Sequence, residues 1–140
     1  MLTLNTFGAQ VGKLNYVSAM TDVTGFGLLG HLAEVCEGSG LSAKIHFNAV
    51  PKFDFLHHYI QQKSMPGGTT RNWESYGMHV SDITEDQKAI LADPQTSGGL
   101  LVAVDDNKTG EFEKLAREHG MKLSPFGTLV KREGKLIEVV

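Results

Sequence analysis

The sequence predicts an α+β fold with a mixed, mainly antiparallel sheet, because helical and strand patterns alternate without the strict rhythm of βαβ units. Residues 41–47 alternate apolar and polar side chains, which is typical of a half-buried strand. Residues 100–104 form a continuous apolar run, which favours a central, well-buried strand. In the flanking segments, apolar residues recur at intervals of three and four, the repeat of one helical face.

The first half of the chain contains three helical patterns. An N-terminal helix is indicated by four apolar residues at helical spacing: Leu4, Phe7, Val11 and Leu14. Unless another segment covers this face, it forms an exposed patch prone to self-association. Residues 17–23 fit a short strand. A second helix is expected to bury a face made of Phe26, Leu29, Leu32, Val35 and Cys36 and to end at residues 38–40.

After the strand at 41–47, Pro51 opens a third helical stretch, which ends at the Pro-Gly-Gly of residues 66–68. Its expected inward face consists of Phe53, Leu56 and Ile60. Residues 68–79 show no sustained period, so we expect irregular structure there. Thr84 and Gln87 fit a capping box, which predicts the start of a short helix.

The last third of the chain is expected to form one helix and a hairpin. Residues 107–119 predict a helix with Phe112, Leu115 and Ala116 inward and Gly120 as its stop. Residues 127–131 and 136–140 flank a polar, glycine-containing turn, which favours a β-hairpin.

Length and composition narrow the possible functions. A chain of 140 residues with 41% hydrophobic and 21% charged residues is typical of one folded domain, here 1–140. The net charge of −3 comes without a basic block, so nucleic acid is not expected as a partner. No apolar run approaches the roughly 18 residues of a membrane span, and we expect a cytoplasmic protein without membrane association. The single cysteine, Cys36, lies on an apolar helical face, which favours packing over catalysis.

Glycine-bearing loops are the candidate sites of chemistry. Gly25, Gly27 and Gly30 have the spacing of a dinucleotide fingerprint, but no acidic residue stands about 20 positions later, so that site is not expected. Residues 8–13 lack the spacing of a phosphate-binding P-loop. Residues 21–27 (TDVTGFG) place a carboxylate and two hydroxyls before a helix, which suits an anion or a phosphate-bridging Mg²⁺. Alternatively, Asp22 or Thr24 merely caps that helix.

Residues 66–72 and 93–99 are two further glycine-bearing segments with hydroxyl side chains. The first segment adds the guanidinium of Arg71, which suits bidentate contact with an oxyanion. A solvated turn, or a turn leading into a buried strand, would also explain each segment. His57 and His58 are adjacent and point about 100° apart on a helix, so they cannot chelate one metal from a single face.

These three segments closely resemble the selenophosphate synthetase (selenide, water dikinase) family. The matching stretches are residues 21–31 (TDVTGFGLLGH), 66–72 (PGGTTRN) and 93–101 (DPQTSGGLL). The resemblance covers only the C-terminal domain of that family. It implies a part in a reaction in which ATP, selenide and water give selenophosphate, AMP and orthophosphate.

The resemblance also implies the roles of individual residues. Asp22 matches an aspartate that reaches magnesium ions bound to ATP phosphates. Binding of the cofactor at the cleft would involve Thr24, Gly25, Gly27, Thr69, Arg71, Asp93, Thr96 and Ser97. No catalytic residue is expected in this chain, because the resemblance places the reactive residue and most of the ATP site in an N-terminal domain. The chain alone is therefore expected to be inactive.

The implied fold is a layered α/β/α domain, as in the aminoimidazole ribonucleotide synthetase-like superfamily. The implied partners are ATP, selenide and the N-terminal domain of the same protein, with a homodimer formed by the full-length enzyme. Two alternatives stay open. The chain could belong to another ATP-dependent enzyme of the superfamily, or it could be a non-catalytic binding module with this fold.

Overall fold

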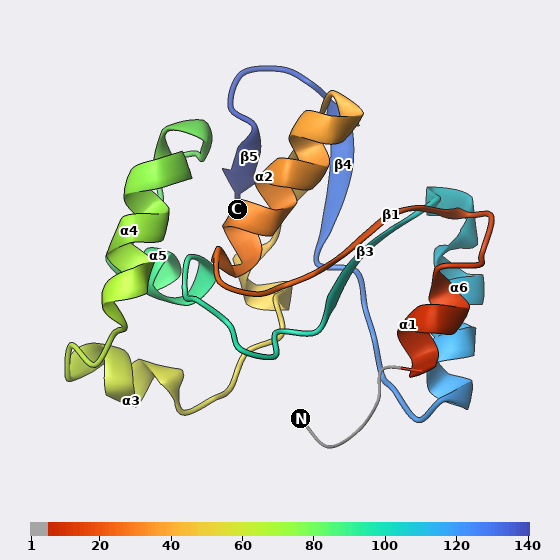
Figure 1. Cartoon of the computed structure of the whole chain (residues 1–140), viewed down its shortest axis with the longest axis horizontal. Coiled ribbons are helices and arrows are strands. Elements are labelled where there is room, and N and C mark those ends of the chain that lie inside the picture. The colour runs from red at the N-terminus through yellow and green to blue at the C-terminus, as the bar shows by residue number, and fades with distance from the viewer. Residues whose placement is uncertain (1–5) are drawn as a thin grey trace.

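The computed structural model describes residues 6–140, which form helices and small sheets and confirm the α+β class (Figure 1). The α-helices are α1 (Thr6–Val11), α2 (Gly27–Ser39), α3 (Leu56–Gln61), α4 (Gly67–Tyr76), α5 (Glu85–Leu91) and α6 (Thr109–Glu118). The strands are β1 (Val17–Asp22), β2 (Leu41–Ile45), β3 (Leu100–Val104), β4 (Gly127–Lys131) and β5 (Ile137–Val139). Short 3-10 turns are η1 (Phe47–Ala49), η2 (Gly77–His79) and η3 (Asp106–Lys108).

Strands β1 and β3 form an antiparallel pair that crosses the molecule (Figure 1). Asp22 pairs with Leu100 at one end, and Val17 pairs with Val104 at the other. The prediction that 100–104 forms a central, well-buried strand is wrong, because within residues 6–140 β3 pairs with β1 alone and every residue in it is partly exposed. The sequence of β3 is apolar throughout because its side chains contribute to two different cores. Leu101 packs on one core, and Val102 and Val104 pack on the other.

The second sheet has the order β4-β2-β5, with β4 antiparallel and β5 parallel to the central strand β2. The predicted hairpin is therefore wrong. Ala43 of β2 pairs with Leu129 on one side and Ile137 on the other, so β2 separates the two strands that the hairpin would have joined. Across both sheets the pairing is mixed and mainly antiparallel, as predicted.

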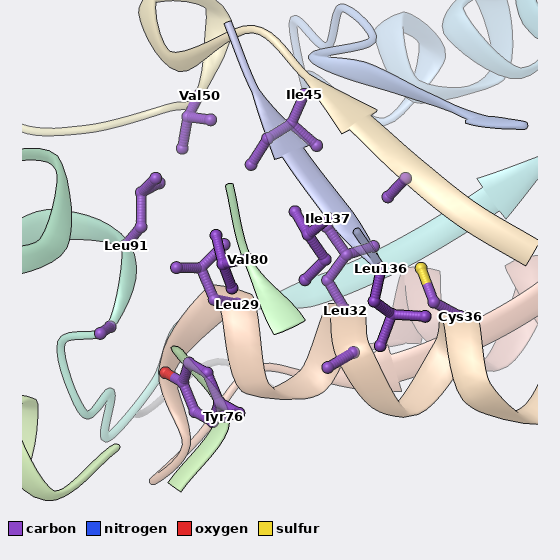
Figure 2. Packing of buried hydrophobic residues seen from close by; sticks show 13 residues of the cluster. Leu29, Leu32, Cys36, Ile45, Val50, Tyr76, Val80, Leu91, Leu136 and Ile137 are labelled. Atoms are coloured by element: carbon purple, nitrogen blue, oxygen red, sulfur yellow. The ribbon is translucent and has the colours of Figure 1, made fainter. Parts of the chain in front are cut away.

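The main core forms where α2 packs against the β4-β2-β5 sheet (Figure 2). Figure 2 shows Leu29, Leu32 and Cys36 on α2 facing the sheet residues Ile45 and Ile137. Cys36 is fully buried, and burial raises the pKa of its thiol to about 11, which confirms a packing role. Phe26 was expected on this face, but it precedes the helix and is 53% exposed.

A second core lies at the other end of the β1–β3 pair, where α1 and α6 pack side by side (Figure 1). Its buried residues are Val11, Tyr16 and Phe112, and Phe7 and Leu14 pack against them. The expected exposed patch is therefore wrong for these residues, because α6 and the strand pair cover them. Leu4 lies outside the described residues.

The segments around the third expected helix differ most from the sequence prediction. Helix α3 begins only at Leu56 and buries none of its residues, and Phe53 before it is 69% exposed. Residues 68–79, expected to be irregular, instead contain most of helix α4. Its buried side consists of Thr69, Asn72 and Tyr76, so polar residues hide its helical period from a pattern of apolar residues.

Two helix boundaries agree with the sequence. Thr84 and Gln87 form the predicted capping box at the start of α5. Gly120 takes a positive φ of 75° just beyond α6, as a helix stop requires. Between residues 6 and 140, every helix is too short or too polar to cross a bilayer.

Candidate functional site at the meeting of three loops

The structure brings together the three segments that the sequence marks as candidates for chemistry. We name them the first loop (residues 22–27), the second loop (residues 66–72) and the third loop (residues 93–99). The first and third loops continue the β1–β3 pair beyond its end. Val23 N donates to Gly99 O at 2.9 Å, Gly98 N donates to Val23 O at 3.2 Å, and Gln95 N donates to Thr24 O at 2.9 Å.

The second loop is joined to the other two by Asn72. Its Nδ2 donates to Gly25 O of the first loop at 2.8 Å and to Ala92 O, next to the third loop, at 3.0 Å. The Asn72 side chain is buried in helix α4, so the Ala92 carbonyl depends on it in a place shielded from water, whereas the bond to the exposed Gly25 is only partly buried. Four residues further on, Tyr76 donates its hydroxyl to Phe26 O at 2.7 Å. Asn72 lies within a sequence motif that does not indicate its partners, and no pattern in the sequence pointed to Tyr76.

Replacing Asn72 with Ala is expected to lower the free energy of unfolding by about 1–3 kcal/mol, because the buried Ala92 carbonyl and the partly buried Gly25 carbonyl both lose their donor. Urea unfolding followed by circular dichroism measures this change. Asn48→Ala is the matched control, since Asn48 is exposed in η1 and should change stability little. Equal effects of the two substitutions would contradict the bridging role.

Asp93 is the half-buried carboxylate of the site. Thr69 Oγ1 donates to its Oδ1 at 3.3 Å, and Gln95 Nε2 donates to its Oδ2 at 2.8 Å. Burial raises the pKa of Asp93 above the usual range of a carboxyl group, and the hydrogen bonds from Thr69 and Gln95 oppose this rise. The loss of solvation outweighs both hydrogen bonds, so the ionised form of Asp93 costs stability.

This raised pKa predicts a pH dependence of stability. Asp93 binds its proton more tightly in the folded than in the unfolded chain, so its contribution is fully present below the unfolded pKa. The contribution is lost as the pH rises through the folded pKa. We therefore expect the stability of the unmodified chain, relative to Asp93→Asn, to fall as the pH rises from below the usual carboxyl range through the raised folded pKa of Asp93. Urea titrations of both chains across this range measure the difference, and a rise with pH would contradict the assignment.

Asp22 lies at the end of β1 with an exposed side chain. Its carboxylate forms no hydrogen bond or ion pair with the rest of residues 6–140. The alternative in which Asp22 or Thr24 caps α2 is wrong, because Phe26 occupies the N-cap position and no side chain caps it. The Thr24 hydroxyl instead lies 3.1 Å from Nε2 of His31, one turn into α2.

The glycines of the first loop differ in their surroundings. Gly27 has a φ of +68°, and a Cβ atom there would lie 2.8 Å from the Ala92 carbonyl carbon. Gly25 is exposed, and no atom of residues 6–140 would lie within 4 Å of a Cβ atom at that position. Gly27 therefore allows close packing of the first loop against the third, whereas Gly25 leaves open space beside the backbone.

The remaining candidates lie on the surface. Arg71, Thr96 and Ser97 are exposed, and no side-chain hydrogen bond or ion pair within residues 6–140 joins them to the hydrogen-bonded set around Asn72 and Asp93. The same part of the chain has no group of three or more His, Cys, Asp or Glu side chains arranged to hold a metal ion. Asp22 is the exposed carboxylate of the first loop, and it could serve as one oxygen ligand of a hard cation. Such a donor fits Mg²⁺ that takes its other ligands from phosphates and water.

The fold and the three joined loops agree with a family assignment. Residues 3–139 match the family described as "AIR synthase related protein, C-terminal domain". Because this match covers nearly the whole chain, the chain belongs to that family.

Three curated relatives carry the name "Selenide, water dikinase". The protein from Pseudomonas putida is 55% identical over 140 residues, which span 100% of this chain and 41% of the relative. The protein from Colwellia psychrerythraea is 54% identical over 130 residues, spanning 93% of this chain and 38% of the relative. The Yersinia pestis protein is 47% identical over 142 residues, spanning 100% and 41% respectively. The chain thus spans about 40% of the length of the curated relatives it matches.

Proposed function

We propose that this chain is the C-terminal domain, 1–140, of a selenide, water dikinase. The observation that carries the proposal is that the fold brings three motifs, which are separated in the sequence, together in one site. Asn72 and Asp93 tie together the three loops whose sequences resemble that family. A protein named selenide, water dikinase is 55% identical in sequence across the whole chain, which supports the same function. The overall reaction would convert ATP, selenide and water into selenophosphate, AMP and orthophosphate.

Within that reaction, the residues of this chain would hold and orient the phosphate end of the nucleotide. Asp22 would bind Mg²⁺, which when bound neutralises charge on the phosphate oxygens. Thr24, Gly25 and Gly27 would line the adjoining backbone, and Asp93 would hold Thr69 and the third loop in place. Arg71 of the second loop and Thr96 and Ser97 of the third loop are exposed and would be available to contact phosphate.

The proposal assigns the reactive residue and most of the ATP site to an N-terminal domain. The share of each relative that this chain leaves unmatched supports this division. A homodimer of the full-length enzyme and a cytoplasmic location belong to the same proposal.

The experiment that tests this function is phosphorus NMR of Mg-ATP and selenide under anaerobic conditions. The chain is assayed alone and then with a separately made N-terminal part of a selenide, water dikinase. Selenophosphate and AMP are expected only in the mixture. Turnover by the chain alone would contradict the assignment of the reactive residue to the other domain. If the two parts bind each other but the mixture forms no product, a non-catalytic module is favoured. If a different phosphorylated product forms, another enzyme of the superfamily is favoured.

A further inference from the structure

His31 is a buried histidine that connects the first loop to the surface of α2. It is 7% exposed, and its two ring nitrogens have different partners. Nε2 lies 3.1 Å from Thr24 Oγ1, and Nδ1 lies 3.1 Å from Oε2 of Glu34. The exposed ring of Phe26 packs edge-on against the imidazole at a centroid distance of 5.9 Å. Both nitrogens of the ring are thus engaged, and the ring is fixed between the loop and the helix.

The partner of Nδ1 determines where the ring carries its proton. An ionised carboxylate only accepts hydrogen bonds, so the contact with Glu34 requires a proton on Nδ1. In a neutral ring, Nε2 then carries a lone pair, so it must accept a hydrogen bond from the Thr24 hydroxyl. Glu34 lies three residues after His31 on the same helix, the spacing at which side chains become neighbours.

This arrangement fixes the direction of the Thr24 hydroxyl. In the neutral ring the proton of the Thr24 hydroxyl points at His31, and the oxygen then has only lone pairs left for any other partner. A group with lone pairs suits a cation or a water molecule bound to a cation, and it repels a phosphate oxygen. Thr24 stands two residues from the exposed carboxylate of Asp22, which is the other oxygen donor of the first loop.

We propose that His31, oriented by Glu34, is a positioning residue that holds the Thr24 hydroxyl as a hydrogen-bond acceptor for the water shell of a divalent cation at Asp22. This inference rests on the proposed function for the identity of that cation. In this inference the Thr24 hydroxyl contacts the water shell of the cation and does not contact the phosphate. Without Glu34, the ring can place its proton on Nε2, and the Thr24 hydroxyl proton is then free to turn outward.

The first test is nitrogen NMR of the imidazole rings in the full 140-residue chain, which distinguishes the two neutral tautomers. His31 is expected to carry its proton on Nδ1. Glu34→Ala is expected to move the proton to Nε2, and Glu34→Gln, which keeps an acceptor oxygen, is expected to restore Nδ1. Glu37→Ala is the matched control, because Glu37 is exposed on the same helix and should leave the ring unchanged. A proton on Nε2 in the unmodified chain, or a tautomer unaffected by Glu34→Ala, would overturn the proposal.

The second test uses Mn²⁺ alone as a paramagnetic probe of the cation site. Broadening of the Asp22 resonances is expected to need about two- to tenfold more Mn²⁺ in Thr24→Val and in Glu34→Ala, the effect of one lost hydrogen bond. Thr24→Ser and Glu37→Ala should match the unmodified chain. Equal Mn²⁺ requirements in all five proteins would overturn the role toward the cation. Neither test uses turnover, so a failure of selenophosphate synthesis in the mixture would refute the proposed function and leave these results standing.

Discussion

Asp22→Asn is expected to lower selenophosphate synthesis in the mixture of this chain with an N-terminal part by about a hundredfold or more. The substitution keeps the size of the side chain and removes the charge that would bind Mg²⁺. A metal ion on phosphoryl oxygens contributes several kcal/mol to charge stabilisation, and each 1.36 kcal/mol corresponds to about a tenfold change in rate. Phosphorus NMR of product formation at fixed Mg-ATP measures the loss.

The fold of the variant should be unaffected, because Asp22 is exposed and its carboxylate has no partner among residues 6–140. Asp106→Asn is the matched control, since Asp106 is an exposed aspartate beyond the opposite end of the β1–β3 pair. This control should keep full activity. Activity of Asp22→Asn equal to that of Asp106→Asn would refute the assignment of Asp22 as a metal ligand.

Gly27→Ala is expected to cause the largest loss of stability, about 2–5 kcal/mol. Two effects combine at this position. A φ of +68° costs an alanine about 1–2 kcal/mol. Its Cβ would also lie 2.8 Å from the carbonyl carbon of Ala92 and 2.9 Å from Asp93 O, and such overpacking typically costs about 1–3 kcal/mol. Urea unfolding measures the sum, and the chain should also lose the packing of the first loop on the third.

Two other glycines separate these effects. Gly40 has nearly the same φ, +69°, but nothing would lie within 4 Å of its Cβ, so Gly40→Ala should show the backbone cost alone. Gly98 has no positive φ, but its Cβ would lie 2.7 Å from Val23 O, so Gly98→Ala should show the steric cost alone. If Gly27→Ala costs no more than Gly40→Ala, the close packing of the first and third loops is refuted.

Local signals in the sequence predicted much of the fold. The capping box of α5, the apolar face of α2 and the helix stop at Gly120 all depend on residues close together in the chain. The hairpin was predicted wrongly because its turn residues are compatible with two arrangements. The choice between them depends on β2, which lies far from that turn in sequence and takes the place between β4 and β5.

The candidate site was predicted less completely. Motif resemblance identified its three loops, but the residue that joins them could not be given its role from spacing. Asn72 binds carbonyls 47 and 20 residues away, and nothing local indicates which carbonyls will need a donor. Helix α4 was missed for the same reason, because its inward residues are polar and are satisfied only by distant partners.

The pairing of Asp22 with Leu100 has a consequence for the order in which the chain folds. This contact closes a long stretch of chain that includes α2, β2 and the second loop, and contacts between distant residues form slowly because the loop entropy must be lost first. Local helices such as α2 and α6 can form earlier. The site is therefore expected to be assembled in a late step of folding, so that ligand binding reports on completion of the native state and not on the appearance of its helices.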